Sequence, residues 1–296
     1  MYNSIDFFYI DPLTHENGSK KNTWEDWGLV GSSRPTIAPA KPITNLVKVT
    51  GMSGFYNASE ILTGYPLYES RTGSFDFIVL NKYNKEDAKR WIDIYNEVCE
   101  YLNGQELCCV FEDEPEYYYQ GVFSVSSFES GEYNSTITID YEVQPYKFNR
   151  LMSDDDWLWD TFNFEHGVVP SDEFKNITVS YGNTKIFSDL EGKIGQMPVT
   201  PEIVVKSWTT GAEVGTSSLI FNATITDKRG KIKPIENLEL KRTDMYENPL
   251  VPAEGFKQSW TLPLLTLYDD VTAFSISTND ADTSVTFNLR FREGRI

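Results

Sequence analysis

The most regular pattern of apolar and polar positions lies between residues 81 and 104. Apolar side chains recur there at steps of three and four residues, which gathers them on one face of an α-helix; they are Ala88, Trp91, Ile92, Tyr95, Val98, Cys99 and Leu102. Asn84 suits the N-cap position of such a helix, and Gly104 follows its last turn, where a left-handed residue is favoured. The pattern therefore predicts one amphipathic helix that packs its apolar face on a sheet.

The rest of the first 150 residues has the pattern of short strands. In residues 135–143 apolar and polar side chains alternate, which indicates a strand with one buried face; the apolar set is Ile137, Ile139, Tyr141 and Val143, and the polar set includes Thr138, Asp140 and Glu142. Residues 31–45 are rich in proline, which cannot donate ladder hydrogen bonds, so we expect an extended arm or long loop that can reach a neighbouring subunit. One helix among such strands predicts an α+β domain with a mainly antiparallel sheet.

The pattern changes near residue 150, where a run of charged residues follows the last strand of the first half. Beyond it, short apolar runs are separated by glycine, proline, asparagine and aspartate, and no amphipathic helix is evident. This spacing is typical of a β-sandwich or jelly roll. We therefore expect a mainly β protein with an α+β domain at residues 1–150 and an all-β sandwich at residues 151–296.

Charge and cysteine content narrow the classes of function. The net charge of the 296-residue chain is -18 at pH 7, which opposes binding to the phosphates of nucleic acids. The three cysteines include the adjacent pair Cys108 and Cys109 and have no zinc-ligand spacing, so we expect neither a disulfide framework nor a metal site. The sequence shows no signal peptide and no apolar stretch of membrane-spanning length, so we expect a protein made in the cytosol without membrane contact.

Candidate catalytic residues are few. His15 and His166 stand outside any known catalytic motif, and Cys108 and Cys109 are expected to be small buried side chains. The acids Glu112, Asp113, Glu114 and Glu116 stand beside Tyr117, Tyr118 and Tyr119, a composition that could suggest a glycosidase pocket. A glycosidase needs two acids held across a cleft, whereas these acids share one turn with Pro115, which favours a solvated hairpin.

Two further groups have a structural and a functional interpretation. Asp154, Asp155 and Asp156 lack the alternation and the glycine of a calcium-binding loop, so a charged linker is the simpler interpretation. Trp157, Trp159, Trp208 and Trp260 could stack on sugars, although tryptophans of a sandwich more often lie in its core. The sequence thus assigns no catalytic, cofactor-binding or metal-binding residue, no cofactor, and no defined ligand site.

Several motifs of the first domain occur together in an order that resembles one protein family. They are Tyr68, Arg71, Phe75 and Phe77 in YESRTGSFDF, the helix end Leu102–Asn103–Gly104, the stretch FEDEPEYYYQGVF, the strand closing on Pro145–Phe148, and WDTFNFE at residues 159–165. In this order and spacing, residues 45–170 resemble the N-terminal domain of the distal tail proteins of siphophages, the Dit family. The second domain is similar to the galectin-like or carbohydrate-module-like domain of that family only in fold class.

The resemblance implies a structural hub at the tip of a phage tail. N-terminal domains would close into a homo-hexameric ring under the tail tube, and C-terminal domains would hold the receptor-binding apparatus. The implied partners are the tail tube protein, the tail-associated lysin or tip protein, and receptor-binding or baseplate proteins. The ring would assemble in the host cytoplasm and let DNA pass without binding it. Two alternatives remain, namely a carbohydrate-binding module for adhesion to the host wall and a glycoside hydrolase.

Overall fold

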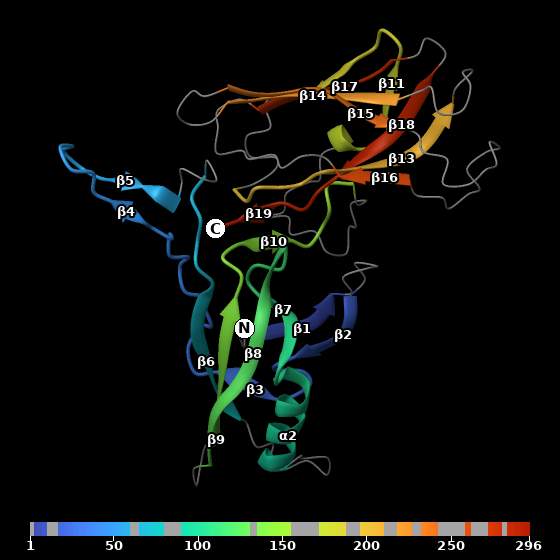
Figure 1. Ribbon diagram of the computed structural model, residues 1–296. Coiled ribbons are helices and arrows are strands. Elements are labelled where there is room, and N and C mark those ends of the chain that lie inside the picture. Colours follow the sequence, from blue (N-terminus) through green and yellow to red (C-terminus); the bar gives the residue numbers. More distant parts are fainter. Residues whose placement is uncertain are drawn as a thin grey trace. The chain divides into compact units, whose positions relative to one another are not determined.

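The computed structural model shows a mainly β protein. It describes residues 3–10, 17–59, 65–79, 90–130, 135–154, 172–187, 196–209, 218–226, 232–241, 258–261, 272–279 and 283–296. The chain divides into two compact units, the first within residues 1–62 and 66–150 and the second within residues 63–65 and 151–295 (Figure 1). The first unit combines one described helix with antiparallel strands, and the second contains antiparallel strands with a single 3₁₀ turn among its described residues.

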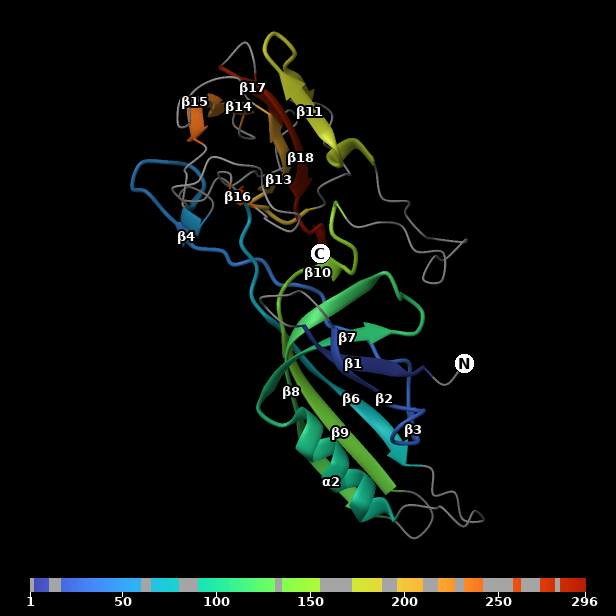
Figure 2. The ribbon, with the colours of Figure 1, turned by 90° about the vertical axis from the view of Figure 1, so that its right-hand side faces the viewer.

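One antiparallel sheet, of strand order β2-β1-β7-β8-β9-β6-β3, forms the frame of the first unit. The strands are β1 (Ile5–Ile10), β2 (Asn17–Asn22), β3 (Leu29–Gly31), β6 (Arg71–Val79), β7 (Gln105–Phe111), β8 (Tyr117–Ser130) and β9 (Ser135–Val143). A short strand, β10 (Lys147–Asn149), adds to β8. The strands β4 (Leu46–Val47) and β5 (Tyr56–Asn57) form a separate hairpin that pairs only with itself. The helix α2 (Trp91–Leu102) packs on β8 and β7 (Figure 2).

The core of the first unit lies between this sheet and α2. In β9 the residues Ile137, Ile139, Tyr141 and Val143 are buried and the intervening ones are not, so the alternation predicted for this strand is confirmed. The neighbouring strand β6 buries Phe75, Phe77 and Val79 in the same way, and β9 pairs with it along its whole length. Because both strands bury the same face, their apolar side chains join one cluster beneath the helix.

The helix differs from the predicted one at its start. It begins at Trp91, after Arg90 in an extended conformation, so Asn84 is not its N-cap; Asn84 and Ala88 themselves lie outside the described residues. The fully covered positions are Ile94, Val98 and Leu102, whereas Ile92 and Cys99 lie at the flank and are only half-buried. These three positions follow one line along the helix; the periodicity selected Val98 and Leu102 but not Ile94, and the predicted Trp91 and Tyr95 pack at the edge of the same core. Gly104 has a φ of 77°, so the predicted left-handed end of the helix is confirmed.

The second unit is a sandwich of two four-stranded antiparallel sheets, of orders β11-β18-β13-β16 and β12-β17-β14-β15. Its elements are a 3₁₀ turn (Asp172–Phe174), β11 (Ile177–Ser180), β12 (Lys185–Phe187), β13 (Glu202–Thr209), β14 (Ser218–Thr226), β15 (Ile232–Lys241), β16 (Gln258–Thr261), β17 (Thr272–Thr278), β18 (Ser284–Arg290) and β19 (Gly294–Arg295). Val205, Val285 and Phe287 of the first sheet share a core with Leu219 and Ile276 of the second. The two apolar faces therefore face each other, as expected of a sandwich.

Candidate functional site

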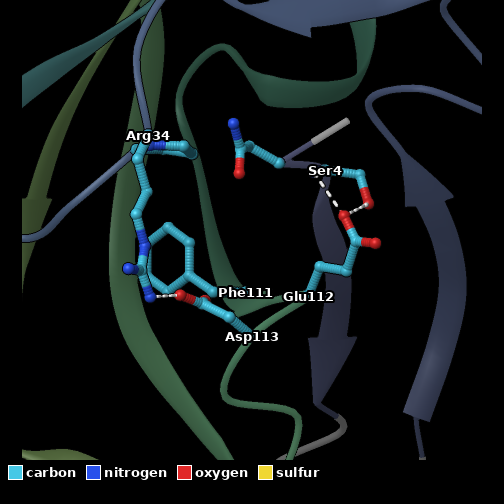
Figure 3. A pocket seen from close by; sticks show the side chains of 7 residues that line it. Ser4, Arg34, Phe111, Glu112 and Asp113 are labelled. Atoms are coloured by element: carbon cyan, nitrogen blue, oxygen red, sulfur yellow. Dashed lines mark hydrogen bonds and ion pairs between the residues drawn. The ribbon is translucent and has the colours of Figure 1, made fainter. Parts of the chain in front are cut away.

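In the acidic turn between β7 and β8, the carboxylates of Glu112, Asp113 and Glu114 bind other segments of the fold. Figure 3 shows a shallow pocket where the Glu112 carboxylate accepts hydrogen bonds from the backbone N–H and the hydroxyl of Ser4, at 3.2 and 3.3 Å. On the other side of the same turn, Asp113 forms an ion pair with Arg34. Glu114 pairs in turn with Lys147. Glu112, Asp113 and Glu114 thus each have a partner on a different segment, which is not the arrangement of two acids facing each other across a cleft.

The predicted hairpin is present as the β7–β8 turn that holds the acids, and the tyrosines after this turn belong to the strand. Tyr117, Tyr118 and Tyr119 begin β8, and all three are buried. The Lys147 ammonium lies 4.8 Å from the centroid of the Tyr117 ring, a cation–π distance. Burial raises the pKa of Tyr119 to about 12, against the opposing charge of Arg71. Tyr119 lies in the core of the first unit, and the ring of Tyr118 stacks on that of Phe148 in β10, so these side chains lie inside the fold.

The start of the arm, which we define as residues 32–45, is fastened to the sheet. The Tyr141 hydroxyl accepts a hydrogen bond from the Ala38 N–H at 2.9 Å and donates to the Thr36 carbonyl at 3.3 Å. The buried Arg71 donates through Nε to the Pro145 carbonyl at 2.8 Å and through a terminal nitrogen to the Ala38 carbonyl at 3.5 Å. The arm therefore leaves the sheet from a fixed point. It is extended and nearly without ladder pairing, as its prolines predicted.

The arm continues into the β4–β5 hairpin, which we call the arm hairpin (residues 46–57). The large apolar side chains of this region are exposed by 39% to 60%; they are Ile43, Leu46, Val47, Val49, Met52, Phe55 and Tyr56. A two-stranded hairpin is marginally stable in water by itself. Exposed apolar side chains gathered on such a hairpin are typical of a surface that another protein covers.

The outward face of the main sheet is acidic. The carboxylates of Asp76, Asp140 and Glu142 accept hydrogen bonds of 2.8 Å from Thr138, Ser126 and Ser70 respectively. No lysine or arginine points outward from β6, β8 or β9, whose residues the structure describes in full, since Arg71 lies on the buried face. Neutral hydroxyls thus hold these carboxylates in place while leaving their charge uncompensated.

Where the structure describes the remaining candidate residues, they are part of the packing of the fold. Cys108 and Cys109 are buried and free of disulfides, as is the half-buried Cys99, in agreement with the prediction. Burial raises the pKa of the Cys109 thiol, which works against nucleophilic chemistry. Trp208 is buried in the core of the second unit, which agrees with the core interpretation of the tryptophans. His15, His166, Asp155, Asp156, Trp157 and Trp159 lie outside the described residues, as does the side chain of Trp260.

Asp154 alone of the aspartate run is described, and it anchors the start of the second unit. Its carboxylate accepts two hydrogen bonds from Arg290, at 2.8 and 2.9 Å, and one of 3.2 Å from Asn288. Burial raises the pKa of Asp154, but the hydrogen bonds from Arg290 and Asn288 and the charge of Arg290 outweigh burial and lower that pKa below its usual value. The residue is therefore a buried ion-pair partner rather than a solvated linker charge.

The described part of the chain contains neither a cluster of metal ligands nor a membrane-spanning helix. No group of histidine, cysteine, aspartate and glutamate side chains there is arranged to hold a metal ion. The helices that the structure describes include none with the length and apolar character needed to cross a membrane.

Comparisons with known proteins gave a match among solved structures. No protein-family model and no curated protein matches the sequence. Among solved structures, the SPP1 Dit (gp 19.1) protein, presented as a paradigm of the hub adsorption apparatus in phages that infect Gram-positive bacteria, matches with a TM-score of 0.48 and 10% identity, covering 99% of each chain. This protein is of the family that the motifs of the first domain resemble.

Proposed function

We propose that this chain is a structural protein of a phage tail, a ring-forming hub that joins the tail tube to the baseplate or receptor-binding apparatus. The observation that carries the proposal is that the motifs shared with the distal tail proteins, although distant in sequence, contact one another in the first unit. Arg71 binds the carbonyl of Pro145, and the rings of Tyr68 and Tyr146 meet edge to face at 5.9 Å. Asn103 forms a parallel bridge with Phe123, the last residue of FEDEPEYYYQGVF. The motifs of residues 68–148 thus contact one another, whereas WDTFNFE lies outside the described residues.

In the proposed assembly the first unit carries the ring interface, with six copies as the expected number. Identical head-to-tail contacts close into a ring when the rotation allows. The partners would be the tail tube protein above the ring, the tail-associated lysin or tip protein, and receptor-binding or baseplate proteins held by the galectin-like second unit. The protein would reside at the virion tail tip after assembly in the host cytoplasm, without an enzymatic activity of its own.

The acidic outward face of β6, β8 and β9 is proposed to line the channel of the ring. Asp76, Asp140 and Glu142 would repel the phosphates of passing DNA, since their charge is not met by a cation on that face. Rings of the variant Asp76→Lys with Asp140→Lys are expected to retain a short DNA duplex at low salt, whereas wild-type rings release it. Equal retention by wild-type rings would contradict this placement.

The residues that suggested the two alternative functions do not support them where they are described. Sugar stacking needs exposed aromatic rings, and the candidate Trp208 is buried, although Tyr181 of the same unit is exposed. Hydrolysis of a glycoside needs paired acids, and Glu112, Asp113 and Glu114 are each held by a separate partner.

The experiment that tests the proposed function is negative-stain imaging of the purified full-length chain, alone and mixed with the tail proteins of its own particle. Rings with a central hole, seen end-on, are the expected result. Solitary particles in all of these mixtures would contradict a hub function.

A further inference from the structure

The pocket of Figure 3 is built by three segments of the first unit that are distant in sequence. They are the residues before β1, the start of the arm, and the end of β7 with the turn that follows; the lining consists of Asn3, Ser4, Arg34, Pro35, Phe111, Glu112 and Asp113. The hollow has a volume of about 290 Å³, open solvent at its mouth included. This is room for one side chain rather than for a longer ligand.

The charges that line this pocket do not balance. Asp113 forms an ion pair with Arg34, so each of these two charges is met by the other. Glu112 is exposed, and the partner that its carboxylate has in the described structure is the neutral Ser4, which donates hydrogen bonds of 3.2 and 3.3 Å. The lining therefore carries one negative charge, on Glu112, that no cation of the pocket compensates.

The rest of the lining supplies an apolar surface and an amide. The ring of Phe111 is held edge to face by Phe75 and Tyr119, with centroids 5.9 Å away in both cases, so its position in the lining is fixed. The Asn3 side chain makes no hydrogen bond within the part of the chain that the structure describes. Asn3 has a φ of 50°, a left-handed conformation that asparagine adopts more readily than most residues. An aromatic ring, an amide oxygen and a carboxylate are all groups that attract an ammonium ion.

We propose that this pocket binds a lysine side chain of a protein partner. An anionic ligand would meet the charge of Glu112 and would find Arg34 already paired with Asp113. An apolar ligand would cover Glu112 and Asn3 without giving either a partner, which costs free energy. A lysine side chain avoids both costs, since its methylene stem can lie on Phe111 while its ammonium group faces Glu112.

The inference goes beyond the proposed function, because neither the ring nor its channel depends on this pocket. All of the lining residues belong to the first unit, so one copy of the chain forms the whole pocket. A lysine held there would fix the partner beside the start of the arm and the β7–β8 turn.

Ligand-observed NMR on the full-length chain tests the inference, with N-acetyl-lysinamide as the probe. Saturation transfer to the methylene protons of the probe reports its binding. The matched control probe is N-acetyl-norleucinamide, which has the same stem without the ammonium group. The lysine probe is expected to bind about tenfold more tightly, since a hydrogen bond to a charged group adds to the apolar contact. Equal binding of the two probes, or no transfer to either, would overturn the inference.

Variants test whether the probe binds in this pocket. Glu112→Gln removes the charge but keeps an oxygen that can accept from Ser4, and is expected to weaken binding of the lysine probe about tenfold. Asn3→Gly keeps a residue that tolerates a positive φ but removes the amide, and is expected to weaken binding about threefold.

The control variant is Glu129→Gln, which removes an exposed carboxylate of β8 outside the pocket and is expected to leave binding unchanged. Equal weakening by Glu112→Gln and Glu129→Gln would show attraction to the net charge alone and would overturn the inference. Because the probe is measured without any requirement for rings, such a failure leaves the proposed function standing, whereas imaging without rings in any mixture contradicts the proposed function itself.

Discussion

The ring of Tyr141 covers Gly73 on the neighbouring strand, its direct partner in the ladder. A Cβ atom at position 73 would lie 2.7 Å from Cζ of this ring, well inside van der Waals contact. Glycine is therefore what allows the tyrosine to lie flat and to bind the arm through its hydroxyl. Tyr141 and Gly73 together therefore determine where the arm leaves the sheet.

Replacing Gly73 by alanine tests this relationship. The added methyl group has to displace the Tyr141 ring, which breaks its hydrogen bonds to Ala38 and Thr36 and frees the start of the arm. We expect a loss of about 1–3 kcal/mol in the free energy of unfolding. We also expect faster proteolysis within residues 32–45. Denaturant titration and limited proteolysis measure the two effects, with Ser74→Ala on the exposed face as the control; an unchanged cleavage rate would contradict the clamp.

The side chains of α2 are buried to different extents, so substitutions at a buried position and at a flank position should differ in their cost to stability. Leu102 is fully buried, so Leu102→Ala is expected to cost about 2–5 kcal/mol of stability. Ile92 lies at the flank and outside the core cluster, so Ile92→Ala should cost less than about 1 kcal/mol. Thermal or denaturant unfolding of the two variants measures both losses of stability. A loss at Ile92 equal to that at Leu102 would show that Ile92 is buried too, as the periodicity predicted.

The ion pair between Asp154 and Arg290 makes the second unit sensitive to acid. The pKa of Asp154 is lower in the folded state than its unfolded value of about 3.9, so its contribution is present above that pH and is lost as the pH falls through the folded pKa. Asp154→Asn should cost about 3 kcal/mol at neutral pH, because it leaves Arg290 without its carboxylate. It should also flatten the decline of stability below pH about 4. The test is the free energy of unfolding of the wild type and of Asp154→Asn from pH about 2 to 7. A parallel decline of the two would contradict this prediction.

Much of the fold could be predicted from the sequence because it follows from local periodicity. The alternation in β9 and the glycine that ends α2 both depend on neighbouring residues alone. The burial of Tyr118 depends on a distant segment, since Phe148 of β10, thirty residues further along, stacks on its ring. The local sequence pattern does not show which distant segment packs on a given strand.

The candidate site was only partly predictable. The prolines of residues 31–45 indicated an arm, but the apolar hairpin that follows has the same alternating composition as a buried strand, so only the structure shows that Val47 and Val49 are exposed. The lack of acids between residues 27 and 59 was a signal in the sequence that could have marked the segment. The acids of the β7–β8 turn raised a catalytic hypothesis because composition does not reveal their partners.

The location of the ring interface can be tested on a fragment. Residues 1–150 include all the surfaces that the account assigns to contacts between copies, so this fragment is expected to form the same oligomer as the full chain. Sedimentation velocity of the fragment, with circular dichroism to show that it is folded, provides the measurement. A folded fragment that stays monomeric at high concentration would place the interface in the second unit.

Assembly of this chain into a ring is tested most directly by native mass spectrometry of the purified full-length protein over a range of concentrations. Each chain has a mass of 33.9 kDa, so the number of copies can be read from the mass of the complex. A closed hexamer as the dominant species is the predicted result. A monomer at every concentration, in a protein shown to be folded, would contradict the account.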